Sequence, residues 1–418
     1  MNERIERSGG CLRIWERHPG RECRPPFESQ PTHSSPTGRS LPVTPTRSPQ
    51  GPEVPAATPV RPPLKLGPLQ LGPLTLESPV LAAPIAGFTD LVFRSIVREH
   101  GGCGLIFTEM VSAGGWIVGN IPPERLRGVA EEERPLGVQL WDREPAMVEE
   151  AARRLVDLGV SLIDLNFGCP KKRIMGKQGA GAKLMRDPSS VGRMVEATVR
   201  GAGSVPVTAK MRLGPSCDSL TAPAVALAAE SAGAVAVTVH GRTAKDSYAV
   251  QVNFDRLAEV VNTVSIPVIA NGDIDGPLAA INMFERTGAA GVMVARAALS
   301  RPWIFRDIAL ALRGEPVPPP PTLAEQRAQL LRHHGRLVTA QGDPWGTVLM
   351  RKFACRYLSG VPGAREFRAA ISRAADAKDF RAIVDALFPA DAPEFAEATA
   401  DGSPVITNQP ALEETCGG

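Results

Sequence analysis

The sequence lacks the features that mark several large classes of protein. No apolar run approaches the roughly 20 residues that a membrane-spanning helix requires, so no membrane protein is indicated. The seven cysteines form no Cys-x-x-Cys pair, which argues against a disulfide framework and a zinc site. No Gly-x-Gly-x-x-Gly follows the first predicted strand, so a Rossmann-type nucleotide site is not expected. The first thirty residues contain no apolar stretch typical of a signal peptide, and we expect a cytoplasmic protein.

An excess of charge of either sign is also missing. The 418 residues include 47 Lys and Arg against 44 Asp and Glu, which leaves a formal net charge of +3. Such a balance does not by itself indicate a nucleic-acid partner. Any basic surface must therefore be local, and the basic residues do gather around a few loops.

Composition divides the chain into four parts. Residues 1–63 are rich in Pro, Ser, Thr and Arg, and residues 390–418 contain Pro, Ala, Glu and Gly without periodicity. Neither segment can bury enough apolar surface to offset the entropy of ordering, so both are expected to be disordered. Residues 64–315 are expected to form one large domain. After a proline-rich linker, the patterns of residues 322–389 predict a small helical bundle.

Short apolar runs alternate with amphipathic helical patterns in the large domain. Most of these helical patterns end in glycine, as helix C-caps often do. Eight alternations over about 250 residues predict a (β/α)8 TIM barrel, with a doubly wound open sheet as the alternative. The predicted strands are VLAAPIAG, GLIFTEM, PLGVQLW, LIDLNFG, PVTAKMRLG, AVAVTVHG, PVIANGDI and GVMVARAA.

Polar side chains stand where these runs end. In a (β/α)8 barrel the carboxyl ends of the strands meet at one rim, which carries the catalytic groups. Taken alone, a lysine here is usually a surface residue and a histidine a satisfied core residue. Repetition at successive strand ends favours one shared site instead. The residues are Gln139, Asn166, Cys169, Lys210, His240, Arg242, Asn271, Asp273 and Arg296.

Cys169 is the strongest candidate for chemistry. It lies in the motif DLNFGCP (Asp164–Pro170), where an apolar run stops abruptly at a Gly-Cys-Pro turn. A free cysteine is usually a small buried hydrophobe. A turn of this kind does not fit a packed core, however, and three cationic residues follow it directly. We therefore expect Cys169 on the active-site rim.

The motif DLNFGCP resembles the active-site signature of the tRNA-dihydrouridine synthases. Further motifs similar to those of the family occur in order along the chain. Near the C-terminus, RKFACRYLSGVPG resembles the RKxxxxYxxGxPG stretch of bacterial members. The ordered motifs are APIAGFTD, TEM, VQLW, AKMRLG, HGRT, NGDI and RPWIF.

This resemblance implies a flavin-dependent oxidoreductase whose barrel binds FMN. NADPH or NADH would reduce the flavin, hydride would pass to C6 of a uridine, and Cys169 would give a proton to C5. A thiol near its ordinary pKa keeps such a proton at neutral pH. One departure is Ala295, because the family usually has glycine at that point. No metal is implied, and the implied flavin-binding residues are Pro84, Ile85, Ala86, Gln139, Lys210, His240, Asn271, Gly272, Asp273, Ala295 and Arg296.

The resemblance also implies a tRNA substrate and a monomeric enzyme. A stacked uridine can reach the rim only after it is extruded from the RNA helix. From composition alone, basic residues on the predicted helices form a solvated face. With the resemblance, residues 322–389 become a tRNA-binding domain that contacts phosphates. The implied substrate residues are Asn166, Arg242, Lys171, Lys172, Arg351 and Lys352.

Two other functions stay open at this point. A flavoprotein similar to dihydroorotate dehydrogenase would act on a free pyrimidine, but the helical bundle would then have no purpose. A catalytically inactive RNA-binding barrel would account for the bundle but not for Cys169, Lys210 and His240.

Overall fold

The computed structural model describes the chain between the two predicted disordered segments. Those segments, residues 1–63 and 390–418, lie outside the described residues. Strands and helices alternate from Val80 to Leu312, and helices alone follow. The described residues are 66–120, 126, 134–358 and 363–388.

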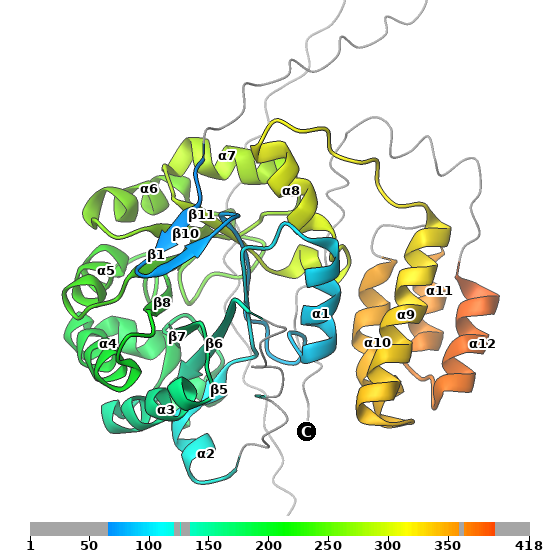
Figure 1. Cartoon of the computed structure of the whole chain (residues 1–418), viewed down its shortest axis with the longest axis horizontal. Helices are drawn as coiled ribbons and strands as arrows, with labels where there is room; N and C mark the ends of the chain where they lie inside the picture. The colour runs from blue at the N-terminus through cyan, green and yellow to red at the C-terminus, as the bar shows by residue number, and fades with distance from the viewer. Residues whose placement is uncertain (1–65, 121–125, 127–133, 359–362, 389–418) are drawn as a thin grey trace, which may run out of the picture. The chain divides into compact units, whose positions relative to one another are not determined.

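All eight predicted strands form, and they close into a parallel barrel (Figure 1). The last strand, β11, pairs with the first, β3, through Val292 and Val80. This pairing closes the ring, so the (β/α)8 prediction is confirmed and the open sheet is excluded. In barrel order the strands are β3 (Val80–Ala82), β4 (Leu105–Phe107), β6 (Leu136–Trp141), β7 (Leu162–Asn166), β8 (Val207–Arg212), β9 (Ala236–His240), β10 (Val268–Asn271) and β11 (Gly291–Val294).

Helices surround the strands (Figure 1). Their buried apolar side chains belong to the main core cluster. In α3, Val148, Ala151, Ala152 and Leu155 are buried at the spacing that keeps them on one helix face. Full burial of each large apolar side chain contributes roughly 1.5–3 kcal/mol. The helices of the barrel are α1 (Leu91–His100), α2 (Ala113–Ile117), α3 (Pro145–Asp157), α4 (Pro188–Ala202), α5 (Ala222–Ser231), α6 (Phe254–Thr263), α7 (Pro277–Thr287) and α8 (Ile304–Leu312).

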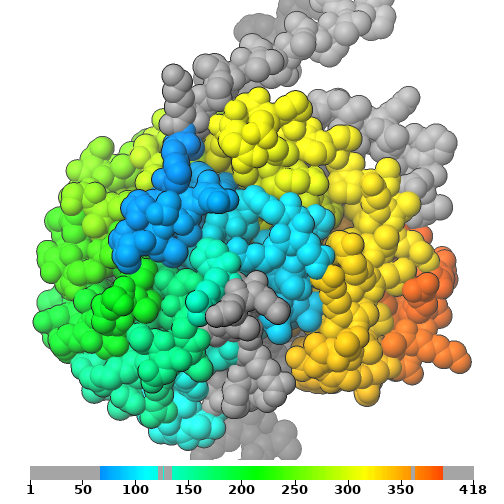
Figure 2. Space-filling model, viewed as in Figure 1, coloured from blue at the N-terminus to red at the C-terminus, as the bar shows by residue number. Residues whose placement is uncertain are grey.

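A short antiparallel hairpin, which the sequence patterns did not predict, packs against the barrel interior. Its strands are β1 (Leu69–Leu71) and β2 (Leu74–Leu76), and its leucines share one buried cluster with Phe107, Ile269 and Met293. Leu69 lies close to Gly291, the first residue of β11, where an added Cβ would come within 3.0 Å of its side chain. The hairpin, blue in Figure 2, therefore covers the amino-terminal end of the barrel, opposite the rim where the strands end.

Helices also make up the described part of residues 322–389. Thr322 and Glu325 form a capping box at the first of them, which fixes where that helix begins. Phe353 is fully buried and packs against Phe93 of α1, with ring centroids 5.8 Å apart. Among the described residues, no helix is long and apolar enough to span a membrane. The helices are α9 (Leu323–Gln341), α10 (Trp345–Tyr357), α11 (Ala364–Ile371) and α12 (Ala377–Leu387).

Candidate active site

A chain of hydrogen bonds leads from the barrel interior to Cys169. Adjacent strands place Gln139 and Thr208 on either side of Asp164 in register. Thr208 Oγ1 and Gln139 Nε2 donate to the two carboxylate oxygens of Asp164, each at 2.7 Å. Asn166 Nδ2 donates to Gln139 Oε1 at 2.8 Å, and Asn166 Oδ1 accepts from the Cys169 backbone N–H at 2.9 Å. The buried carboxylate thus fixes the amides of Gln139 and Asn166 and the start of the cysteine turn.

Burial governs the charge at both ends of this chain. It raises the pKa of Asp164 to about 6, although the bonds from Gln139 and Thr208 and the charge of Lys210 oppose the shift. It also raises the pKa of the half-buried Cys169 thiol, although the Lys171 N–H and the Arg212 charge oppose this. The thiol therefore keeps its proton at neutral pH, as a general acid must.

Arg212 holds the cysteine turn from the neighbouring strand. Its Nε donates to Gly168 O at 2.9 Å and its Nη1 donates to Thr243 O at 2.7 Å. Only 5% of the residue is exposed. This buried guanidinium ties the loop after β7 to the loop after β9, and it places a fixed cation near Cys169.

Lys210 lies beside this chain and faces β10. Its Nζ donates to Asn271 Oδ1 at 3.0 Å, and Asn271 Nδ2 donates to Met293 O at 2.8 Å. Burial lowers the pKa of Lys210 to about 8, against the attraction of Asp164. The ammonium is still charged at pH 7, and a negatively charged group placed beside it would offset part of its desolvation.

Charged and aromatic groups crowd the ends of β9 to β11. Arg242 is 1% exposed, and it forms a two-pronged ion pair with Asp273 while it donates to Val250 O at 2.6 Å. Arg296 Nη2 donates at 3.1 Å to Asp273 Oδ1, the oxygen that also accepts from Arg242 Nη1, and its guanidinium lies 4.1 Å from the centre of the Tyr248 ring. Asp273 thus joins two arginines, and the arginines and a tyrosine form one face of the rim.

His240 lies among these cations and is 8% exposed. Its pKa is held well below the ordinary value by burial and by the surrounding charges of Arg212, Lys210, Arg242 and Arg296. Its Nε2 is 3.4 Å from Arg242 Nη1. The imidazole is therefore neutral at pH 7, so it can serve as a hydrogen-bonding group but not as a cation.

Gly272, directly after β10, packs closely against two neighbouring side chains. Gly272 has φ +128°, and an added Cβ would lie 2.7 Å from Val252 and 3.1 Å from the His240 ring. Only glycine suits that position. Ala295 directly precedes Arg296 at the end of β11 and is half-buried. Together with the half-buried Lys210, these residues fit the phosphate and the electron-rich edge of a flavin nucleotide.

The loop after β3 supplies the remaining predicted flavin contacts. Pro84 and Ile85 are half-buried, whereas Ala86 is exposed. The backbone N–H of Ile85 donates to Thr89 Oγ1 at 3.2 Å, and the Thr89 N–H donates to Ile85 O at 3.1 Å. The loop is thus a compact turn with an apolar surface of the kind that a flat ring requires.

A sequence profile of the family described as Dihydrouridine synthase (Dus) matches residues 80–392. The chain belongs to the dihydrouridine synthase family. The family identification from the ordered motifs is confirmed, and with it an oxidoreductase of the flavin-dependent type that reduces uridine in tRNA. The match includes the barrel and all four C-terminal helices of the described chain.

Two curated relatives are similar to this family member over most of their length. The tRNA-dihydrouridine synthase B of Pseudomonas aeruginosa is 42% identical over 294 residues, which cover 70% of this chain and 87% of that protein. The tRNA-dihydrouridine synthase B of Xanthomonas axonopodis pv. citri is 40% identical over 290 residues, or 69% and 86% of the two chains.

The residues predicted to contact tRNA fall into two groups in this dihydrouridine synthase. Lys171 and Lys172 are exposed directly after the catalytic turn. Arg351, by contrast, donates from Nε to Ala374 O at 2.8 Å, and Lys352 Nζ donates to Gly87 O in the loop after β3. Arg242 is likewise occupied by Asp273. RNA contacts for these three residues stay predictions, and each has a partner within the protein.

Sequence reasoning assigned no role to Asp164 or Arg212. Asp164 belongs to the cysteine motif and lies two residues before Asn166, so strand alternation puts both side chains on the inner face of the barrel. Arg212 follows Lys210 at the same spacing. That spacing was the available signal for both residues.

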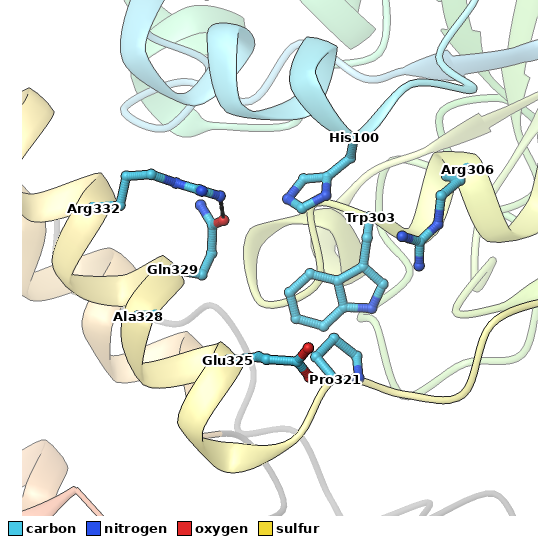
Figure 3. A pocket seen from close by; sticks show the side chains of 8 residues that line it. All are labelled: His100, Trp303, Arg306, Pro321, Glu325, Ala328, Gln329 and Arg332. Carbon is cyan, nitrogen blue, oxygen red and sulfur yellow. Dashed lines mark hydrogen bonds between the residues drawn. The ribbon is translucent and has the colours of Figure 1, made fainter.

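A hollow lies away from the rim of this dihydrouridine synthase, between α1, α8 and α9 (Figure 3). Its volume is about 300 Å³, and none of its lining residues belongs to the predicted site. Within the described residues, no group of three or more His, Cys, Asp or Glu side chains could hold a metal ion. The hollow is lined by His100, Trp303, Arg306, Pro321, Glu325, Ala328, Gln329 and Arg332.

Proposed function

We propose that this enzyme reduces the C5–C6 double bond of specific tRNA uridines with FMN as the flavin and NADPH or NADH as the reductant, as a monomer in the cytoplasm. The observation that carries the proposal is the hydrogen-bond chain from Asp164 through Gln139 and Asn166 to the Cys169 turn, beside the half-buried Lys210. It provides a protonated thiol and a fixed cation on one rim, which are the two groups that this reduction needs.

Residues from both sides of the rim would hold the FMN. Pro84, Ile85 and Ala86 would contact the ring, and Gln139 would bind its pyrimidine edge. Gly272, Ala295 and Arg296 would hold the phosphate, with Asp273 as the carboxylate that orients Arg296. Asn271 would orient Lys210 through their hydrogen bond. When bound, FMN supplies hydride to C6 of the base.

Lys210 would act on charge at the flavin. A cation held in a site of low dielectric stabilises negative charge more strongly than one in water. Its ammonium is fixed by Asn271 and so needs no reorganisation during the reaction. His240, which is neutral, would donate or accept a hydrogen bond near the same edge without adding charge.

Cys169 would deliver the second hydrogen as a proton at C5. The S–H bond breaks, the C5–H bond forms, and the thiolate that remains is stabilised by the nearby Arg212 cation. Asn166 would bind the edge of the extruded uracil while it holds the cysteine turn. Lys171 and Lys172 would contact the backbone phosphates that flank the extruded nucleotide.

The proposal is tested with tRNA that lacks modified nucleosides. We expect the purified protein with FMN and NADPH to produce a nucleoside two daltons heavier than uridine, and the yield to depend on NADPH. A parallel reaction offers free uridine and orotate in place of RNA. Reduction of the free pyrimidines with no change in the tRNA would favour the activity similar to dihydroorotate dehydrogenase instead.

A further inference from the structure

The loop after β3 is held from outside the barrel by α10. Lys352 Nζ donates to the backbone carbonyl of Gly87, 265 residues away in sequence. Gly87 has φ +81°, and an added Cβ would lie 3.7 Å from the ammonium. The loop can therefore bring its carbonyl to the lysine because glycine occupies its tip.

Aromatic packing surrounds this contact. Lys352 Nζ lies 5.2 Å from the centre of the Phe88 ring and 5.5 Å from that of Phe353. The Phe88 and Phe353 rings pack edge to face at 5.1 Å. Cations bind aromatic faces at such distances, most strongly where water is excluded. The lysine is thus fixed between a residue of the loop and a residue of α10.

The same ammonium acts on the carboxylate that ends the loop. Asp90 caps α1 by accepting from the Phe93 N–H at 2.9 Å. Burial raises the pKa of Asp90, and the charge of Lys352 opposes this shift. Arg94 opposes it as well, whereas Glu109 adds to it. Lys352 therefore contacts the tip of the loop and stabilises the charged form of its last residue.

We propose that Lys352 is a positioning residue for the flavin, which holds residues 83–90 in the shape that receives the flavin ring. The helical domain then serves the redox site as well as the RNA, because its α10 completes a wall of that site. The inference rests on the proposed use of FMN. It is an alternative to the RNA-phosphate role predicted for this residue, because one of the three N–H donors of the ammonium is already used by Gly87 O.

The test compares Lys352→Met with a matched control, Arg336→Met. Arg336 is also half-buried on a helix of the same domain, and it forms an ion pair with Glu99 of α1. Both variants remove one positive charge that bridges the barrel and the helical domain, but only Lys352 contacts the loop. Two quantities are measured for each: the dissociation constant of FMN, and the hydrogen exchange of a peptide spanning residues 83–90.

Lys352→Met is expected to weaken FMN binding about tenfold, as loss of a hydrogen bond from a charged group would. Exchange in the loop should rise with or without FMN, and Lys352→Arg should restore both values. Arg336→Met should leave both unchanged, and the two Met variants should bind tRNA equally well. Selective loss of tRNA affinity in Lys352→Met, with unchanged FMN affinity and loop exchange, would overturn the positioning role.

Failure of the underlying function gives a different result. If the wild-type protein binds no FMN, the proposed function is wrong. The exchange measurement still decides whether Lys352 holds the loop, because it needs no ligand. Equal exchange in the loop for the wild type and Lys352→Met would contradict that role whether or not FMN binds.

Discussion

The two halves of the catalytic rim solve different electrostatic problems. From β6 to β8, a chain of neutral amides and a hydroxyl surrounds one buried carboxylate and ends at a protonated thiol. From β9 to β11, two arginines, an aspartate and a neutral histidine surround a glycine that packs closely against Val252 and the histidine ring. We expect the first half to keep and release a proton and the second half to hold an anion, and Lys210 lies between them.

The largest effect should come from the end of the proton-holding half. Cys169→Ala is expected to slow dihydrouridine formation by about 100- to 10,000-fold, the range over which general acids contribute. Flavin content and the rate at which NADPH bleaches the flavin should stay near wild type, because neither needs the thiol. The measurement is a single-turnover assay with tRNA on enzyme reduced beforehand. Near-normal dihydrouridine formation would remove Cys169 from the mechanism.

Lys210→Met probes the boundary between the two halves. FMN affinity is expected to fall by about 2 kcal/mol, or roughly 30-fold, because a half-buried charge partner is lost. In the wild type, affinity should also fall as pH rises through about 8, where Lys210 loses its proton. The variant should lack that pH dependence, and fluorescence titration of FMN from pH 6.5 to 9.5 measures both. An unchanged pH profile in the variant would mean that another group titrates.

Lys210→Met should weaken FMN binding, but it should stabilise the flavin-free protein. The pKa of Lys210 is about 8 in the folded protein, whereas its ordinary value is 10.5. Between pH 8 and pH 10.5 the unfolded chain therefore binds more protons than the folded protein does. Stability should therefore rise with pH across that window, and Lys210→Met should lose this slope. At pH 7 the variant should be more stable by on the order of 1–3 kcal/mol, measured by urea unfolding without FMN. A less stable variant would contradict the desolvation argument.

The sequence predicted the barrel better than the contacts of its side chains. Short apolar runs, separated by helical patterns that mostly end in glycine, predicted all eight barrel strands, and motif order identified the family. The β1–β2 hairpin was missed because each strand has only three residues and a Gly-Pro pair interrupts the pattern. The partners of Arg242, Arg351 and Lys352 could not be predicted, because they come from segments that only the folded chain brings together.

Gly272→Ala tests the anion-holding half by adding a methyl group without changing any charge. The new methyl group would lie 2.7 Å from Val252, at a φ of +128° that side chains rarely adopt. Strain of this size is expected to weaken FMN binding about tenfold. Gly276→Ala is the matched control, because it lies four residues away and no atom comes within 4 Å of its Cβ position. Equal FMN dissociation constants for the two variants would show that the loop after β10 does not approach the flavin.

The smallest effect should come from the buried start of the proton-holding half. Gln139 and Thr208 each donate to one carboxylate oxygen of Asp164. When Asp164 is protonated, one of these oxygens becomes a hydroxyl donor, and it then faces the N–H or O–H donor of its former partner. The pKa of Asp164 is about 6, and wild-type turnover should therefore decline as pH falls through 6. Asp164→Asn imitates the protonated form, so it should be about fivefold slower at pH 7.5, the cost of one misplaced hydrogen bond. Its rate should show no further step near pH 6. If turnover of the variant still declined near pH 6 as much as turnover of the wild type, the titrating group would be another residue of the rim. The charge of Asp164 would then not be needed to orient the amides of Gln139 and Asn166.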